Sequence, residues 1–556
     1  MDGVVWLKTR KQWGFAVPGD AGEGVGDEGF DGTDNSKQLG LLDIVGLTVG
    51  AIVGADIYVA SAFGSGRLGP ASLLGWALAG VMALAIALTF ARCAMLVPKV
   101  GGPYAYVGTA FGQFPGFLVG WALWIAEWTS LAVFPIAFAR YLGVLIPGLS
   151  PVGVALAKVA FIGFITLTNF FGTRLAGTVN DLLTAFKLAP LALLTLLGLA
   201  FLVIHPQTAQ ANLMPFMPKG LGGLGDALVL IFWAYAGFEL ATIPAGEVRR
   251  PTRTVPVAIV LGMAIVTVFY LLTNLVLLSA VSWGELAAAR APLTLGFVRI
   301  LESLLPGLAG AGGIFMTVGA IVSIAGSDES GTIGTSRLAY AMAADGHLPK
   351  VFATLHPKYG TPYVALLFQN VSALVAALIG TLGGLIRLTV FSLAMAYLLT
   401  SLATLKLHRN RAESANAGPG TAGEEATVGP VASVGRQIFR HVPYAGTVAS
   451  LFLLSQVGWQ PALAGLGMLG VGVLVYTYLS PEREMEEIKA WITSRRYQRM
   501  RVHYLGQRFL AWPLTWRRRH SPGSLGSPAS ALPAMEAEAA EELDPRKGPS
   551  SGHPSA

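Results

Sequence analysis

The stretch Val49-Gly50-Ala51-Ile52-Val53-Gly54-Ala55-Asp56-Ile57-Tyr58 lies in the middle of the first long apolar run of this chain. Two glycines interrupt this stretch, and each glycine destabilises a helix by about 1 kcal/mol relative to alanine. The stretch also carries a carboxylate, Asp56, at a depth where lipid does not tolerate a charge. Irregular backbone persists at membrane depth only where protein or a water-filled cavity satisfies its polar groups. We therefore expect a broken helix that forms half of a small-molecule site near the bilayer midplane.

The composition of the chain is that of a helical membrane protein. Of its 556 residues, 53% are hydrophobic and 12% are charged, whereas a soluble domain carries about 25% charged residues. The apolar runs are long enough to cross a hydrocarbon core of about 30 Å as helices, and the alternation of a β-barrel is absent from the sequence. The single cysteine, Cys93, excludes an intramolecular disulfide and a cysteine-based metal cluster.

Twelve apolar runs predict an all-α polytopic fold with twelve membrane helices. Lys and Arg gather in the segments that would share one side with both termini, so the positive-inside rule predicts cytoplasmic termini. We expect an integral, multi-pass protein of the plasma (inner) membrane. The runs cover residues 41–64, 71–95, 116–146, 152–172, 182–204, 222–246, 256–281, 308–333, 362–382, 385–405, 443–460 and 462–480.

Changes of composition along the chain predict six parts. Residues 481–520 combine many arginines with aromatic side chains, so they form either an amphipathic helix on anionic lipids of the inner leaflet or a basic tail that only sets orientation. The parts are a cytoplasmic leader without a signal-peptide core (1–38), a ten-helix core (39–408), a flexible cytoplasmic loop (409–441), the last two membrane helices (442–480), the basic segment (481–520) and a disordered tail (521–556).

A second interrupted helix occurs at Ile231-Phe232-Trp233-Ala234-Tyr235-Ala236-Gly237-Phe238-Glu239, in the sixth apolar run. If helices one to five and six to ten are two repeats, this break is the counterpart of the first, and paired breaks mark a transporter site. Half-helix N-termini offer N–H groups to an anionic group, whereas unwound carbonyls or a carboxylate accept from an ammonium. An α-amino acid carries one group of each kind. Gly237 alone would equally fit close helix packing.

Four sets of motifs resemble the amino acid permeases of the amino acid–polyamine–organocation superfamily. They lie at residues 49–58, at 98–107, at 232–239 with 246–256, and at 336–349 with 361–362. They follow the order and spacing of the family over about residues 40 to 408. The resemblance implies a five-plus-five inverted-repeat core with broken first and sixth helices, which hold the substrate, and transport by alternating access.

The resemblance also implies which residues form the substrate site. Backbone groups of the two interrupted segments would hold the carboxylate and the amine of the substrate, and neighbouring side chains would shape the pocket. Carried over by position, the site residues are Ile52, Val53, Gly54, Ala55 and Asp56 in the first helix and Phe232, Trp233, Ala234, Ala236 and Gly237 in the sixth.

Asp56 departs from the family pattern, which has a glycine at that position. Three interpretations are open: Asp56 binds a cationic group of the substrate, pairs with a cation of the protein, or turns away and caps a half-helix. The obvious protein cation is Lys187 in the fifth run. The resemblance implies that the ammonium of Lys187 occupies a cation site, as in members that work without sodium. A lysine near a helix end would instead extend to the membrane interface.

Four further acids lie within the predicted membrane helices: Glu127, Glu239, Asp328 and Glu329. Acids at this depth mark ion paths or substrate sites. We expect Asp328 or Glu329 to titrate or to pair with Lys187, with structural ion pairing as the alternative. Glu239 would act in gating or proton coupling. The nearby serines Ser323, Ser327 and Ser330 share one face of the eighth helix.

These features predict a secondary active transporter of amino acids or related amines that is proton-coupled or exchanging and independent of sodium. Two alternatives are a carrier of cationic amines such as polyamines and an amino-acid-binding receptor that signals through its C-terminal tail. The sequence contains no Cys/His metal spacing, phosphate loop or nucleic-acid-binding module. We therefore expect no enzymatic activity, cofactor, metal or nucleic acid, and a small-molecule substrate and the lipid bilayer as partners.

Overall fold

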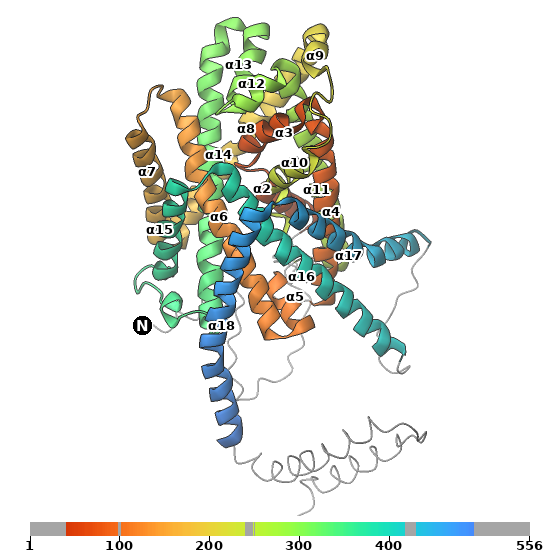
Figure 1. The fold of residues 1–556 in the computed structure, drawn as a ribbon, viewed down its shortest axis with the longest axis vertical. Helices are drawn as coiled ribbons and strands as arrows, with labels where there is room; N and C mark the ends of the chain where they lie inside the picture. The colour runs from red at the N-terminus through yellow and green to blue at the C-terminus, as the bar shows by residue number, and fades with distance from the viewer. Residues whose placement is uncertain (1–39, 98–101, 240–247, 249–250, 417–429, 494–556) are drawn as a thin grey trace, which may run out of the picture. The chain divides into compact units, whose positions relative to one another are not determined.

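The computed structural model describes residues 40–97, 102–239, 248, 251–416 and 430–493, and the elements in this part of the chain are helices (Figure 1). The chain divides into two compact units, Met1–Pro481 and Glu482–Ala556. The first unit contains both predicted helix breaks. The predicted leader and disordered tail, and the basic segment beyond the end of the last helix at Thr493, lie outside the described residues.

The long helices confirm a polytopic membrane fold. Eight stretches are long and apolar enough to cross a membrane, and three shorter apolar helices accompany them in the described part of the chain. The count of twelve and the inverted repeat stay predictions. The eight stretches are Ile57–Leu96, Gln113–Leu145, Pro151–Phe170, Lys187–Ile204, Thr254–Ala280, Pro306–Ala344, Leu382–Asn410 and Trp459–Leu479; the three shorter helices are Leu41–Ile52, Leu224–Tyr235 and Tyr363–Ile379.

The helices follow the predicted runs, with four short helices that the sequence did not suggest, α5, α9, α12 and α13. The order is α2 (Leu41–Ile52), α3 (Ile57–Leu68), α4 (Ser72–Leu96), α5 (Gly102–Phe111), α6 (Gln113–Leu145), α7 (Pro151–Phe170), α8 (Thr173–Ile204), α9 (Pro206–Leu213), α10 (Leu224–Phe232), α11 (Pro251–Ala280), α12 (Trp283–Ala288), α13 (Pro292–Leu304), α14 (Ala309–Ala344), α15 (Tyr363–Ile379), α16 (Leu382–Asn416), α17 (Pro430–Gln456) and α18 (Trp459–Thr493).

Several boundaries differ from the sequence prediction. The predicted loop at 409–441 is helical at both ends, because α16 continues to Asn416 and α17 begins at Pro430. The fifth helix begins at Thr173 rather than at 182, directly after Gly172, whose φ of 112° ends the preceding turn. Glycine tolerates this backbone conformation, which other residues avoid. The earlier start places Lys187 well inside α8.

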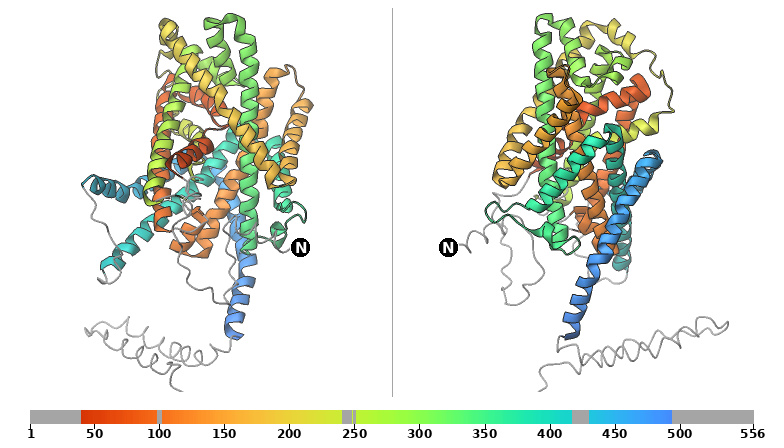
Figure 2. Two further views of the ribbon diagram at one scale, coloured as in Figure 1. Left: turned by 180° about the vertical axis from the view of Figure 1, so that it is seen from behind. Right: turned by 60° about the vertical axis from the view of Figure 1, so that its left-hand side comes forward.

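Helix α14 lies beside both α6 and α8, as all three views show (Figures 1 and 2). Small residues on α14 permit this close approach: Gly319 lies against Pro190 of α8, and Gly331 lies against Leu131 of α6. Membrane helices commonly pack through such small residues, because lipid provides no hydrophobic drive for their association. The contact places the middle of α14 next to the first helix break.

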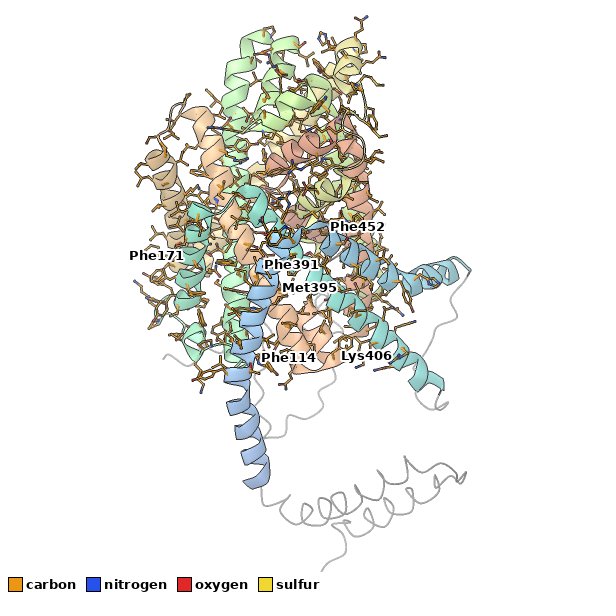
Figure 3. All side chains as sticks on the ribbon, in the orientation of Figure 1. Phe114, Phe171, Phe391, Met395, Lys406 and Phe452 are labelled. Carbon is orange, nitrogen blue, oxygen red and sulfur yellow. The ribbon has the colours of Figure 1, made fainter. Side chains whose placement is uncertain are left out.

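Helices α16 and α18 pack together through Phe391 of α16 and Gly465 of α18, and Figure 3 labels Phe391 and Met395 on α16. Helix α18 is also joined to α6, because Trp121 Nε1 donates a hydrogen bond of 2.9 Å to Met468 O. Helix α16 thus packs against both α6 and α18, and it also contacts α10 and the 3₁₀ turn Trp233–Tyr235.

Candidate functional site

The first helix break occurs where the sequence predicts it. Helix α2 ends at Ile52, and Val53 is extended, with φ −75° and ψ 100°. Residues 53–56 are not helical, and α3 begins at Ile57. Asp56 occupies the position before the first residue of α3, but its side chain makes no capping hydrogen bond. The interpretation of Asp56 as a helix cap is therefore wrong.

The second break begins after Phe232. A 3₁₀ turn covers Trp233–Tyr235, Ala236 is extended with ψ 156°, and Gly237 has φ +110°. A side chain at 237 would be strained at this φ, and its Cβ would lie 2.7 Å from Ala51 O. Gly237 therefore allows the helix to break and also allows the two segments to pack closely. The sequence alone had left open which of these two roles the glycine has. Its contact with Ala51 brings the two breaks together.

Tyr270 of α11 connects the two breaks. Its hydroxyl lies 3.1 Å from Ile52 O and 3.0 Å from Ala234 O, and the residue is fully buried. Carbonyls at the end of a helix lack intrahelical donors, so the tyrosine satisfies groups that the breaks release. Sequence reasoning missed Tyr270. The available signal was a tyrosine, whose hydroxyl needs a partner when buried, within a run that the sequence predicts to cross the membrane.

Lys187 reaches the first break from α8. Its Nζ donates a hydrogen bond of 2.6 Å to Gly50 O in the last turn of α2, and the residue is 7% exposed. A cation suits the C-terminal end of a helix, where the dipole is negative. The burial excludes the alternative in which Lys187 extends to the interface. Among the described ion pairs, none joins Lys187 to Asp56, Asp328 or Glu329, so the predicted pairing with the eighth-helix acids is not formed.

Ser327 of α14 contacts the backbone of the first break. Ala55 N donates a hydrogen bond of 3.0 Å to Ser327 Oγ, and a Cβ at Gly54 would lie 2.6 Å from the same oxygen. Gly54 is therefore required for this approach.

The Oδ1 atom of Asp56 is buried without a hydrogen-bond partner among the described residues. Glu127 and Lys187 are the charged side chains near enough to act on Asp56 electrostatically.

Glu127 and Glu239 add two further carboxyl groups to the site. Glu239 Oε2 accepts hydrogen bonds of 3.1 Å from Gly237 N and from the hydroxyl of Tyr397 on α16. Glu127 comes from α6, and its Oε2 lies 3.9 Å from the position of a Cβ at Gly331. Glu239 is the neighbouring acid that acts on Glu127. Three carboxyl groups thus follow one another from the first break to the second.

The other predicted site residues form the walls of the site. Ile52, Val53, Gly54 and Ala55 are buried, as are Phe232, Trp233 and Ala234, whereas Ala236 and Gly237 are half-buried. The indole of Trp233 donates a hydrogen bond of 3.3 Å from Nε1 to Ser130 Oγ on α6. The described residues contain no group of His, Cys, Asp and Glu that could hold a metal ion.

Asp328 and Glu329 lie away from both breaks, although they follow Ser327 directly. Consecutive helix positions differ by about 100° in direction. Glu329 Oε2 accepts a hydrogen bond of 2.9 Å from the hydroxyl of Thr168 on α7. Both carboxylate oxygens of Asp328 are buried and have no hydrogen-bond partner among the described residues. Gln369 of α15 donates to the Thr332 carbonyl one turn further on, at 3.0 Å. Glu329 therefore faces a separate polar cluster between α7, α14 and α15.

One end of the site is held by an ion-pair cluster around Asp226, in the first turn of α10. Its Oδ2 accepts from Arg67 Nε at the end of α3, and its Oδ1 accepts from Arg387 Nε and Nη2 of α16, at 3.0 and 2.5 Å. A single carboxylate thus ties together both half-helices that lead to the breaks and the neighbouring α16.

Comparison with known proteins supports the resemblance seen in the motifs. The sequence profile described as "Amino acid permease" matches residues 39–466. A branched-chain amino acid permease of Bacillus subtilis is 26% identical over 461 residues, covering 79% of this chain and 92% of the relative. A serine/threonine exchanger of the same organism is 31% identical and covers 67% of this chain and 84% of its own length. The mouse b(0,+)-type amino acid transporter 1 is 30% identical, with 68% and 77% covered.

Proposed function

This chain belongs to the amino acid permease family, and on that premise we propose that it is a secondary active transporter of amino acids or related amines. The observation that carries the proposal is the contact between the two helix breaks at Gly237 and Ala51. Paired breaks at the midplane expose half-helix ends that can bind a small polar molecule where lipid could not solvate it. Its role is transport rather than catalysis.

The two breaks offer complementary groups to a substrate. The N-terminus of α3 carries a partial positive charge, whereas the unwound carbonyls and the carboxyl groups of Asp56, Glu127 and Glu239 can accept from an ammonium. Trp233 and Phe232 provide an apolar wall. The site therefore suits a small molecule with an amino group and an apolar or extended side chain.

Alternating access requires that one end of the site opens while the other closes. The Asp226 cluster closes the end predicted to face outside. On the side predicted to face the cytoplasm, Gly46 of α2 and both Ser330 and Gly334 of α14 are exposed. We propose a carrier in which α2 and α3 move separately about the break at 53–56.

We further propose that transport is independent of sodium and is coupled to protons or occurs by exchange. Lys187 places its amino group beside the Gly50 carbonyl, where a metal cation would otherwise find its oxygen ligand. Glu127, Glu239, Asp328 and Glu329 are acids at membrane depth that can carry a coupling proton. The basic segment at 481–520 is proposed to lie on anionic lipids, with both termini in the cytoplasm.

Uptake by the purified chain in proteoliposomes tests the proposal. A panel of labelled amino acids and amines would be offered at several pH values, with and without sodium. We expect saturable uptake of at least one compound and no stimulation by sodium. Absence of uptake for every compound would contradict the transport function, and stimulation by sodium would contradict the role of Lys187.

The alternative of a receptor makes a different prediction. Removing the chain from residue 481 leaves the membrane helices in place. If the protein is a transporter, the shortened chain keeps its uptake. If the shortened and full chains both bind an amino acid but neither moves it, the receptor hypothesis is favoured.

A further inference from the structure

Two arginines at the end of the membrane helices predicted to face outside have no partner among the described residues. Arg140 lies near the end of α6, and Arg290 lies in the short connection between α12 and α13. Neither forms a hydrogen bond or an ion pair with any residue that the structure describes. The other described arginines at this end are paired with acids: Arg67 and Arg387 with Asp226, and Arg299 with Glu285 and Glu302.

Contacts of Tyr141 bring the two arginines to the outer side of the first break. The hydroxyl of Tyr141 donates a hydrogen bond of 2.8 Å to Tyr58 O, in the first turn of α3. The backbone amide of Leu293, near the start of α13, lies close to the same hydroxyl. Arg140 directly precedes Tyr141, and Arg290 lies three residues before Leu293. Both arginines therefore lie near the junction of α6, α13 and the half-helix that leads away from the break.

The two guanidinium groups are near enough to act on each other electrostatically. Arg140 is half-buried and Arg290 is exposed. Lys158 of α7 also acts on Arg140, but its ammonium is already bound by Ala377 O at 2.7 Å. Like charges repel, and a guanidinium that loses water without gaining an acceptor is unfavourable. An anion between the arginines would relieve the repulsion and accept from their N–H groups, whose planar fork matches a carboxylate.

The arginine pair lies beside the closed end of the site. Helix α12 packs against α3, where a Cβ at Gly66 would lie 3.4 Å from the Cβ of Ala287. Gly66 directly precedes Arg67, which belongs to the Asp226 cluster. Arg290 follows Ala287 by three residues. A molecule that enters when this end opens would therefore meet the arginines before it reaches the breaks.

We propose that Arg140 and Arg290 form a carboxylate-binding site at the outer entrance, separate from the site between the breaks. The site binds the carboxylate of an incoming amino acid through the N–H groups of both arginines. A free carboxylate ion such as acetate has the same chemistry and binds there more weakly. This inference rests on the proposed transport function and adds a first binding step to it.

Uptake kinetics in proteoliposomes test the role of the pair in transport. The amino acid that the full chain takes up best would be measured at several concentrations and several ionic strengths. In Arg140→Gln and in Arg290→Gln we expect the half-saturating concentration to rise about three- to tenfold with an unchanged maximal rate. Added salt should slow wild-type uptake at low substrate concentration more than that of the variants, because salt screens the attraction.

Arg299→Gln is the matched control, because it removes the same charge from the same end but from an arginine that acids already bind. We expect it to keep the wild-type half-saturating concentration and salt dependence. An equal effect of Arg299→Gln would show a general positive field instead of a site and would overturn the inference. Arg290 is exposed, so Arg290→Gln decides the question even where Arg140→Gln does not fold.

A binding measurement separates the inference from the transport function. Thermal stability of the purified full chain in detergent would be followed with acetate and with neutral acetamide, at constant ionic strength. We expect acetate alone to stabilise the wild type, and neither compound to stabilise the variant with both arginines replaced by glutamine. This result without uptake of any amino acid supports the site and contradicts transport. Uptake with no selective effect of acetate and with unchanged kinetics in the variants overturns the inference and leaves transport standing. Neither uptake nor an effect of acetate contradicts both.

Discussion

The ammonium of Lys187 donates a hydrogen bond to the carbonyl oxygen of Gly50, with 2.6 Å between the two atoms. This contact joins the middle of α8 to the last turn of α2, at the edge of the first break. It fastens the last turn of α2, the half-helix that we propose moves during alternating access. A charged side chain in this position binds the negative end of a helix rather than a carboxylate.

Replacing Lys187 by methionine tests the importance of that contact. We expect uptake to fall at least tenfold, because a hydrogen bond to a charged group contributes about 1.5–3 kcal/mol. Lys158→Met is the matched control, since Lys158 also donates to a carbonyl, Ala377 O at 2.7 Å, but between α7 and α15. Wild-type uptake by Lys187→Met would show that the contact has no role in transport.

Tyr270→Phe should weaken the connection between the two breaks. The change leaves the carbonyls of Ile52 and Ala234 without their common donor, and an unsatisfied buried polar group costs about 1–3 kcal/mol. We expect a lower thermal stability and a higher half-saturating substrate concentration than in the wild type. Tyr444→Phe is the control, because Tyr444 is 58% exposed on α17. Equal stability of the two variants would contradict the prediction.

Gly237→Ala should abolish the contact between the breaks. The new Cβ would lie 2.7 Å from Ala51 O at a φ of +110°, and such strain costs about 1–3 kcal/mol before the clash is counted. We expect poor folding or complete loss of uptake. Gly163→Ala, on an exposed face of α7 with nothing within 4 Å of the new Cβ, should fold and transport normally. Normal uptake by Gly237→Ala would mean that the breaks need not touch.

Asp226→Asn should loosen the closed end of the site. It removes the charge shared by Arg67 and Arg387. We expect a cysteine introduced at Ser130, beside Trp233, to react faster with a membrane-impermeant thiol reagent from outside, in a background without Cys93. Glu285→Gln, which disrupts the exposed pair with Arg299, is the control. Unchanged labelling would show that the Asp226 cluster does not limit opening.

Glu329→Gln tests proton coupling in the cluster between α7 and α14. If a coupling proton binds there, wild-type uptake rises as the outside pH falls, and this rise is reduced in the variant. Thr168→Ala, which removes the hydrogen bond to Glu329 together with the hydroxyl's contacts to carbonyls of its own helix, should shift the pH profile without abolishing it. A pH dependence that is identical in all three proteins would place proton coupling elsewhere.

Local sequence was sufficient to predict both helix breaks. Gly50, Gly54 and Gly237 weaken the helix within their own segments, and the positions of the breaks in the structure agree with that prediction. The start of α8 was predicted too late, because residues 173–181 are only partly apolar and the apolar run begins after them. The earlier start places Lys187 deeper in α8. The alternative with a buried ammonium therefore holds, and the one in which the side chain extends to the membrane interface does not.

The sequence by itself determined that this chain is a helical membrane protein with two interrupted helices and acids at membrane depth, because composition and glycine placement act locally along the chain. Only the tertiary structure decided the partners of those groups. Lys187 binds the carbonyl of Gly50, Tyr270 joins the breaks, and Ser327 and Glu329 face different helices although two residues apart. The physical reason is that a helix turns each side chain by about 100° from the last, and the neighbouring helix found in that direction is set by long-range packing.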